Sequence, residues 1–409
     1  MKKFFPIILG SDENAYGNCR LFAELTGEKP LIMCSFQLYA TRHSDILDCI
    51  ATPDFDTDAV FVPALLSVLR EKREQYEKVA VIPCSDRYLQ LLSLHYDEFG
   101  GLIANGFVSP DLLGRLDTKD TFYALCESLG LDYPKTAVAS KVEWESALTR
   151  AGLGFPLVVK PENSNGYSYL HAHFEGKKKV FFVNSPDEYA RIIKNMSSSS
   201  FDGKLIIQEF IPGGDECMRV MNCYSDGNGK VRFMCLGQPV LEEYAPATIG
   251  NYAAIISRSD MEIYEKIEAF LNGVGYVGYS NFDMKYDRRT GKYMLFEINP
   301  RPGRSSYFVR GTGNNLMEYV MRDVLGDLPE GTVYSEPSAL WTEIPKCTLL
   351  KYVKDPELKK EIKSLYASKK VSKTLFNPAD RNLRRNFAIT KRYYSFIKAY
   401  GKYYFEKDR

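Results

Sequence analysis

The sequence lacks paired cysteines. Nine cysteines are scattered along its 409 residues, and none forms a C-x-x-C pair. An odd number of scattered cysteines is typical of a reducing compartment, and it argues against a disulfide framework or a structural zinc site. We therefore expect reduced thiols and a cytoplasmic protein.

Long apolar runs and an excess of charge of one sign are also missing. No window reaches the roughly 18 apolar residues of a membrane span. The N-terminal apolar run stops at Gly10, which is too short for a signal-peptide core. Because the net charge is only +1, we do not expect the chain to bind nucleic acid.

At 409 residues the sequence is long enough for two or three domains. Strand and helix patterns alternate from Phe5 to Pro83, which predicts a small doubly wound α/β domain over residues 1–115. The loop 10–14 follows its first strand and could be a substrate loop or only a structural one. A larger domain over residues 116–330 and a basic extension over 331–409 complete the predicted α/β and α+β organisation.

Residues 278–304 predict a β-hairpin that gathers acidic and amide side chains. A polar turn at 287–291 separates two β-prone runs, so Asp283 lies near Glu297 across the hairpin. Asn299 is two residues beyond Glu297 and shares its strand face. Three hard oxygen ligands suit Mg²⁺ that also bridges phosphates, and Arg301 adds a donor fork for a phosphate. The alternative is a solvated surface hairpin with scattered charges.

Other segments indicate a nucleotide site less strongly. Lys160 ends an apolar strand, where a lysine needs an anionic partner or must reach water. Gln208 and Glu209 end another strand before a Pro-Gly-Gly turn, and Glu216 follows; such a hinge could bind adenine through its backbone and ribose through a carboxylate. The polar segment 162–167 could cover phosphates with backbone N–H groups, and the loop-like region 242–258 could form a lid.

The C-terminal region is basic and aromatic. From residue 346 onward it holds eighteen Lys and Arg against six Asp and Glu. Three interpretations stay open: a helical cap on the fold, a helix that makes weak contact with a membrane surface, or a patch for an anionic substrate. The helix expected over 141–150 belongs to the preceding domain.

The order and spacing of these motifs resemble the ATP-grasp superfamily over residues 117–330, with 1–115 resembling its usual preceding α/β domain. This resemblance implies a fold of two α+β subdomains that clasp ATP. Several stretches resemble the bacterial carboxylate–amine ligases of the D-aspartate ligase type: LGSDENAYGNCRLFAE, LIIQEFIPGGDECMRVMNCYSDGNGKV, YVGYSNFDMKYDRRTGKYMLFEINPRPGRSSY and GNYAAII.

The resemblance implies an ATP-dependent ligase that forms an amide bond through an acyl phosphate. In the type enzyme an amino-acid carboxylate is joined to the amine of a peptidoglycan precursor peptide. The alternatives are an ATP-grasp ligase of free amino acids or of a natural-product precursor, and a non-catalytic nucleotide-binding regulator. The oligomeric state is open, a homodimer included.

The residues match the motif with the following expected roles. ATP is expected to contact Lys119, Lys160, Gln208, Glu209, Phe210, Ile211 and Glu216. Mg²⁺ or Mn²⁺ is expected to be held by Asp283, Glu297 and Asn299. Arg301 and Lys160 are expected to stabilise the charge that develops during phosphoryl transfer. A substrate carboxylate is expected to contact Arg304, Ser305, Ser306 and Arg258.

Overall fold

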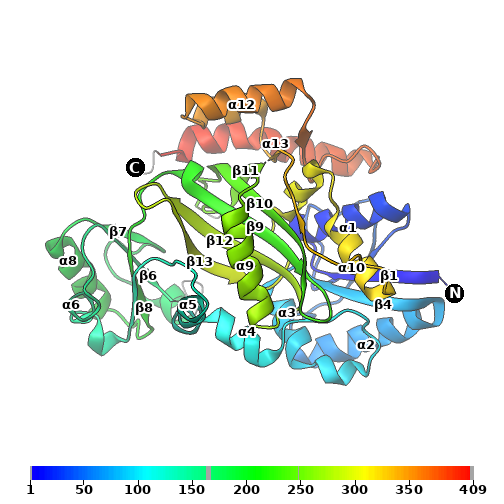
Figure 1. Cartoon of the computed structure of the whole chain (residues 1–409), viewed down its shortest axis with the longest axis horizontal. Coiled ribbons are helices and arrows are strands. Elements are labelled where there is room, and N and C mark those ends of the chain that lie inside the picture. Colours follow the sequence, from blue (N-terminus) through cyan, green and yellow to red (C-terminus); the bar gives the residue numbers. More distant parts are fainter. Residues whose placement is uncertain (1, 163–166, 247, 406–409) are drawn as a thin grey trace. The chain divides into compact units, whose positions relative to one another are not determined.

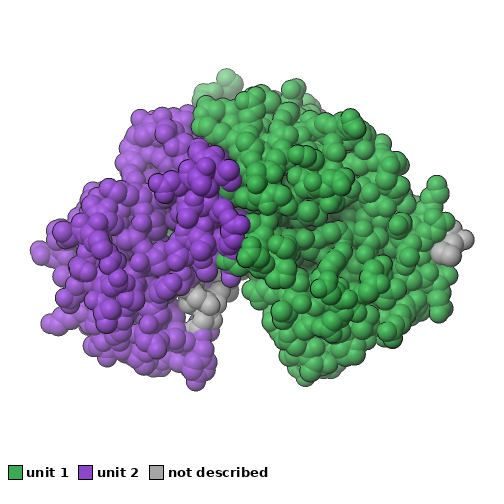
Figure 2. All heavy atoms as spheres, turned by 60° about the horizontal axis from the view of Figure 1, so that its bottom comes forward, with its two compact units in different colours: residues 1–114, 214–284, 298–408 green, residues 115–213, 285–297, 409 purple. Residues whose placement is uncertain are grey.

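A computed structural model describes residues 2–162, 167–246 and 248–405. It divides the chain into two compact units (Figure 2). Unit 1 consists of residues 1–114, 214–284 and 298–408, and unit 2 consists of residues 115–213 and 285–297. The chain therefore passes from one unit to the other several times. The division into 1–115, 116–330 and 331–409 stays a prediction.

Unit 1 begins with a parallel sheet in the order β3-β2-β1-β4. Alternate side chains of β1 face two different cores: Phe4 and Ile8 belong to one, and Phe5, Ile7 and Leu9 to the other. Helices on both faces make the sheet doubly wound, as predicted. Its strands are β1 (Lys2–Leu9), β2 (Leu31–Cys34), β3 (Asp48–Ala51) and β4 (Tyr76–Pro83), and its helices are α1 (Glu13–Thr26), α2 (Asp58–Gln75), α3 (Asp86–Leu94) and α4 (Pro110–Asp117), with the 3-10 turn η1 (Tyr96–Phe99).

The first helix starts inside the segment 10–14, which the sequence predicted as a loop. Asp12 is its N-cap, and the Asp12 carboxylate accepts a hydrogen bond from the Ala15 backbone N–H at 3.0 Å. Asp is a favoured cap because its side chain satisfies an N–H that the helix leaves unpaired. Glu13 and Asn14 are consequently the first helical residues, and the loop 10–14 shrinks to residues 10–12.

The second sheet follows the order β13-β12-β9-β10-β11-β15-β16, with β14 beside β10. In Figure 1, α9 lies across one of its faces. The strands are β9 (Met218–Ser225), β10 (Val231–Glu242), β11 (Tyr252–Arg258), β12 (Gly278–Asp287), β13 (Lys292–Asn299), β14 (Val333–Tyr334), β15 (Leu340–Thr342) and β16 (Val371–Ser372). The helical segments are η3 (Asp215–Cys217), α9 (Met261–Gly273), η4 (Ser306–Thr312) and α10 (Leu316–Leu325).

The C-terminal extension is part of the unit 1 core. It contains α11 (Lys346–Tyr352), α12 (Pro356–Ala367) and α13 (Leu383–Tyr403). Leu375 and Ile389 pack with side chains of the first sheet, and Phe396 and Tyr400 belong to a second cluster with β10, β11 and α12. One face of α13 is thus a structural cap, which is the first of the three interpretations.

Unit 2 contains an antiparallel sheet in the order β5-β8-β6-β7. Its core includes the fully buried Trp144, which stacks on Phe201 with 5.7 Å between the ring centroids. The strands are β5 (Thr136–Ala139), β6 (Leu157–Pro161), β7 (Phe181–Val183) and β8 (Leu205–Glu209). The helices are α5 (Lys119–Ser128), η2 (Lys141–Glu143), α6 (Ala147–Ala151), α7 (Tyr167–His171) and α8 (Pro186–Ser197).

Within the described ranges, no helix is both long and apolar enough to cross a membrane.

Candidate active site

The predicted hairpin is present as β12 and β13. The turn between them is closed by the Gly291 backbone N–H, which donates to the Asp287 carbonyl at 2.8 Å, and Gly291 has a φ of +73°. A positive φ is adopted by glycine without the steric cost of a Cβ. The turn leaves Asp283 on β12, and Glu297 and Asn299 on one face of β13.

In unit 1, Asp283 and Asn299 meet directly. The Asn299 amide donates to Asp283 Oδ2 at 3.0 Å, and the Tyr252 hydroxyl donates to Asp283 Oδ1 at 2.7 Å. The Asn299 Oδ1 atom accepts from Arg301 at 3.3 Å. A carboxylate and an amide oxygen are donors that suit Mg²⁺, so this part of the expected metal set fits the ion. No three His, Cys, Asp or Glu side chains gather as a metal site among the residues that the structure describes.

Arg301 is held by a residue that the sequence did not point to. Its guanidinium makes a bidentate ion pair with Asp86, at 2.6 Å from Nε to Oδ1 and 3.0 Å from Nη2 to Oδ2. Burial opposes the charged form, but the hydrogen bond and charge of Asp86 outweigh it and raise the pKa of Arg301. Ser85 caps α3 and so fixes the position of Asp86 in its first turn.

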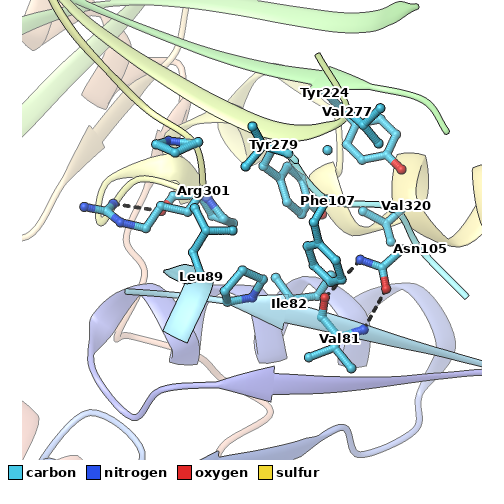
Figure 3. A pocket seen from close by; sticks show the side chains of 16 residues that line it. Val81, Ile82, Leu89, Asn105, Phe107, Tyr224, Val277, Tyr279, Arg301 and Val320 are labelled. Atoms are coloured by element: carbon cyan, nitrogen blue, oxygen red, sulfur yellow. Dashed lines mark hydrogen bonds between the residues drawn. The ribbon is translucent and has the colours of Figure 1, made fainter. Parts of the chain in front are cut away.

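A small cavity lies beside Arg301 (Figure 3). At about 20 Å³ it has room for about one water molecule. Asn105 stiffens its wall through two hydrogen bonds with the Val81 backbone, at 2.8 and 3.0 Å (Figure 3). The cavity is therefore a packing space and not a substrate pocket.

In unit 2, Lys119 pairs with a proposed metal ligand. Its ammonium donates to Glu297 Oε2 at 3.0 Å and to the Phe296 carbonyl at 2.6 Å. Lys160 lies close enough to Lys119 and Glu297 for both charges to affect its pKa. Burial and the positive charge of Lys119 lower the pKa of Lys160, and Glu297 opposes this shift. Two lysines and a carboxylate thus gather at one place in unit 2, and the lysine repulsion would be relieved by an anion.

The residues expected to bind adenosine differ in their contacts. Gln208 is buried, and its amide donates to the Tyr123 hydroxyl at 2.9 Å and to Thr136 Oγ1 at 2.8 Å, which ties β8 to its neighbours. Glu209 accepts from Arg289 at 3.0 Å. Phe210 lies under the Lys285 ammonium, at 5.3 Å from its ring centroid.

The rest of the hinge divides between the two units. Ile211 is buried in unit 2, whereas Glu216 lies in η3 of unit 1, where its carboxylate accepts from the Gly214 N–H at 3.3 Å. Of the expected phosphate segment, residues 163–166 lie outside the described residues.

Arg304 is surrounded by carboxylates in unit 1. It donates to Glu13 and, at 2.8 Å, to Glu243, and both acids are almost fully buried. Burial opposes its charge, but the two carboxylates raise the pKa of Arg304. Arg392 of α13 also donates to Glu13, at 3.2 Å. Charged groups of both signs lie here, so the ammonium and carboxylate groups of an amino acid could bind by exchanging partners with this network.

The other expected substrate residues have less room for a ligand. Ser305 and Ser306 are buried at the start of η4. Arg258 makes a bidentate ion pair with Glu361, at 2.6 and 2.7 Å, and donates to Gln238 at 2.8 Å. Its guanidinium is therefore occupied within unit 1.

Sequence reasoning missed several residues of the site. Asp86, Glu13, Glu243 and Tyr252 all contact an expected site residue, yet they come from distant segments. The only signal in the sequence was the Ser-Asp pair after an apolar strand, which indicates a helix start. This pair predicts that Asp86 lies at the start of a helix, but it does not predict that Asp86 contacts Arg301.

Solved structures define the class. The L-amino acid ligase of Bacillus licheniformis superposes with a TM-score of 0.53 at 16% identity, and covers 79% of this chain and 74% of that chain. The N5-carboxyaminoimidazole synthetase of Staphylococcus aureus superposes with a TM-score of 0.58 at 13% identity, and covers 83% of this chain and 82% of that chain. At these identities the likeness establishes the fold alone, which is the ATP-grasp fold.

The sequence comparison is more specific. No family model matches the chain. The D-aspartate ligase of Enterococcus faecium strain Aus0004 is 37% identical over 415 residues, which covers 100% of this chain and 98% of that protein. The chain belongs to the D-aspartate ligase-like family of ATP-grasp carboxylate–amine ligases, and the predicted family is confirmed.

Proposed function

We propose that this enzyme joins the carboxylate of an acidic amino acid, D-aspartate being the first candidate, to the amine of a peptidoglycan precursor peptide. The match to a D-aspartate ligase along the full length of both chains carries this proposal. The alternating charges around Arg304 support it, because they suit a substrate that has an ammonium group and carboxylates.

The reaction would proceed in two steps. A substrate carboxylate oxygen attacks the γ-phosphorus of ATP, and the bond to the bridging oxygen breaks, so that ADP leaves and an acyl phosphate forms. The amine nitrogen then attacks the acyl carbon, phosphate leaves, and the nitrogen loses a proton. Both steps depend chiefly on positioning and on neutralisation of charge.

The residues would contribute as follows. Lys119 and Lys160 neutralise phosphate oxygens, and Arg301 stabilises the charge on the transferred group. Asp283, Glu297 and Asn299 would hold Mg²⁺ or Mn²⁺, which supplies Lewis-acid neutralisation of the phosphates. Gln208, Glu209, Phe210, Ile211 and Glu216 would form the adenosine site. Arg304 with Ser305 and Ser306 would orient the substrate carboxylate, and Arg258 stays a weaker candidate.

Three further proposals concern the setting in which the enzyme acts. The enzyme would act in the cytoplasm, and a homodimer is compatible with the sequence. Weak contact with a membrane surface would use the outer face of α13, where Leu383 and Phe387 are exposed. Co-sedimentation with phosphatidylglycerol vesicles tests this contact, and equal recovery of a Phe387→Ser variant would contradict it.

The test of function is ADP release with a panel of D- and L-amino acids, with and without a muramyl-peptide acceptor. We expect ADP release that depends on both an acidic D-amino acid and the acceptor. Release with free amino acids alone would indicate a ligase of small peptides, and no release with any of them would indicate a nucleotide-binding regulator.

The accompanying variant is Glu297→Gln. It removes one charge from the expected metal set, and we expect the rate of ADP release to fall by about 10²–10³-fold. Glu127→Gln, on α5 of the same unit, is the control. A wild-type rate in Glu297→Gln would show that the metal assignment is wrong.

A further inference from the structure

Unit 1 has an open pocket outside the residues discussed so far. Its volume is about 630 Å³, which is within the usual range for pockets that bind small molecules. It is bordered by one side of α1, by η4, and by the segment from the end of α12 to residue 378. The C-terminal extension therefore supplies more than half of the residues that line it.

The charge of this pocket is strongly one-sided. Five cationic side chains and a single carboxylate, that of Glu24, line it. The cations are Arg20, Arg310, Lys369, Lys370 and Lys373. A concave surface with charge of one sign concentrates ligands of the opposite sign. The ligand should consequently carry more than one negative charge.

The two arginines are fixed by partners of their own. Glu24 accepts from Arg20 at 2.7 Å and from Arg310 at 2.8 Å, so one carboxylate serves both guanidinium groups. Arg20 also donates to three backbone carbonyls of residues 373, 374 and 376, at 2.7, 2.9 and 3.0 Å. These contacts shape the wall and leave an excess of positive charge.

The lysines supply the remaining charge. Lys369 and Lys370 are exposed, and neither has an ion-pair partner among the described residues. The Lys373 ammonium lies 2.7 Å from the Tyr393 hydroxyl and 4.1 Å from the Tyr393 ring centroid. Burial lowers the pKa of Lys373, and Glu343 opposes the shift. An anion beside this ammonium would offset the cost of its burial.

Two hydroxyl groups of the wall also lack partners. The side-chain oxygens of Tyr366 and Ser372 are buried and have no hydrogen-bond partner within the described part of the chain. Buried polar groups are almost always hydrogen-bonded, so each exception needs an explanation. Both residues line the pocket, but their hydroxyl oxygens have almost no accessible surface, so the case for a ligand rests on the cations.

The kinds of cationic side chain in the pocket indicate which anionic group it binds. Planar carboxylates are best matched by the free fork of an arginine, but both guanidinium groups here already pair with Glu24. The available donors are ammonium groups, which act as point charges and bind phosphate oxygens well. From this composition we propose that the pocket binds the phosphate or diphosphate group of a ligand other than ATP.

The position of the pocket suggests where the group comes from. The Thr374 backbone N–H, one residue beyond Lys373, donates to Glu343 at 2.5 Å, and Glu343 senses the charges of Glu13 and Arg304. The pocket thus adjoins the proposed substrate charges within unit 1. The phosphate group belongs either to the amine-bearing acceptor, which rests on the proposed function, or to free pyrophosphate.

The first experiment is calorimetric titration of the full chain with inorganic pyrophosphate. We expect Lys369→Glu/Lys370→Glu to weaken binding by at least about 10-fold, since two favourable charges become unfavourable ones. Lys360→Glu/Lys363→Glu on α12 has the same change in charge outside the pocket and should change the affinity less than twofold. Binding of ATP should be unchanged in both double variants.

The second experiment identifies the source. Ligation is measured with an acceptor peptide that carries a diphosphate and with the same peptide without it. If the acceptor supplies the group, Lys369→Glu/Lys370→Glu raises KM only for the diphosphate-bearing peptide, with kcat unchanged. If pyrophosphate is a free ligand, its binding is lost and neither KM changes. Both results support the site.

Other outcomes would overturn it. These are no binding of pyrophosphate by the wild type, equal affinity in all variants, or an equal loss in both double variants. A loss of binding to phosphatidylglycerol vesicles without a loss of pyrophosphate binding would assign the charge to a membrane surface instead. Calorimetry needs no turnover, so a chain that releases no ADP would contradict the proposed function and leave this test valid.

Discussion

Asp86 and Arg301 form the contact that positions the arginine proposed to act in phosphoryl transfer. The pair is bidentate, and Arg301 also donates to Asn299. Asp86→Asn keeps the shape but removes the charge, so we expect kcat to fall by roughly 10-fold, since misplaced groups lose much of their effect. Steady-state kinetics measure this loss.

Asp111→Asn is the matched control, because Asp111 is also an acid in the first turn of a helix of unit 1. Asp86→Glu should recover part of the rate if position is what matters. A kcat above the wild-type value in Asp86→Asn would mean that Asp86 withholds Arg301 from the phosphate.

Residues close in sequence were the predictable part of the site. Asp283 and Asn299 meet because a hairpin turn and the two-residue repeat of a strand place them together. Asp86 and Arg301 are separated by 215 positions, and no local pattern reports such a pair. The alternative of a solvated hairpin with scattered charges does not account for the specific partners of Asp283 and Asn299.

At the scale of elements, α13 is attached to unit 1 through a buried ion pair. Arg385 and Asp380 lie 3.1 Å apart with fully buried side chains. Asp380 also accepts from Tyr16 at 3.0 Å and from Ser44 at 2.6 Å. Removal of one member leaves an uncompensated buried charge, so we expect Asp380→Ala to reduce the free energy of unfolding by about 3–5 kcal/mol.

Urea denaturation of the full chain measures this effect. Arg384→Ala, which changes an exposed neighbour on the same helix, should cost less than about 0.5 kcal/mol. The double variant Asp380→Leu/Arg385→Met should regain part of the loss. A loss below 1 kcal/mol in Asp380→Ala would contradict a structural role for the pair.

Two elements differ from the sequence prediction for physical reasons. The expected loop over 242–258 contains the strand β11, in which Ala253, Ala254, Ile255 and Ile256 are fully buried. A strand buried on both faces has no alternation of polar and apolar residues, so the usual pattern is absent.

The helix expected over 141–150 is broken into η2 and α6, which are joined around Trp144.

For the whole molecule, Glu343 should make stability depend on pH. Burial raises its pKa to about 7, and the charge of Glu13 adds to the shift. The ordinary value for Glu is lower, so the folded state binds the proton more tightly than the unfolded state. Stability from this group is therefore full at low pH and is lost as the pH rises from about 4.5 to 7.

Glu343→Gln removes this titration. The difference in unfolding free energy between wild type and variant should change by roughly 2–3 kcal/mol between pH 5 and pH 8. Denaturant unfolding at several pH values measures it, with Glu336→Gln, on an exposed loop, as the control. A pH-independent difference would show that Glu343 titrates normally.

The overall fold was predictable because the ATP-grasp motifs keep one order along the chain. The assignment of segments to compact units was not, since unit 1 is assembled from three separate segments. The periodicity of apolar residues predicts helices and strands within a contiguous stretch of chain. It does not predict which distant segments share a hydrophobic core. The pocket lined by Lys369 and Lys370 is of this kind, because its walls come from both ends of the sequence.

The buried pair of Asp380 and Arg385 also has a consequence for synthesis of the protein. Tyr16 and Ser44 are made first, while their common acceptor Asp380 is made near the end of translation. Domains usually fold as units while the chain emerges, but here Tyr16 and Ser44 gain their shared buried acceptor only after Asp380 has been made. Premature termination before residue 380 would release a chain in which Tyr16 and Ser44 lack this acceptor.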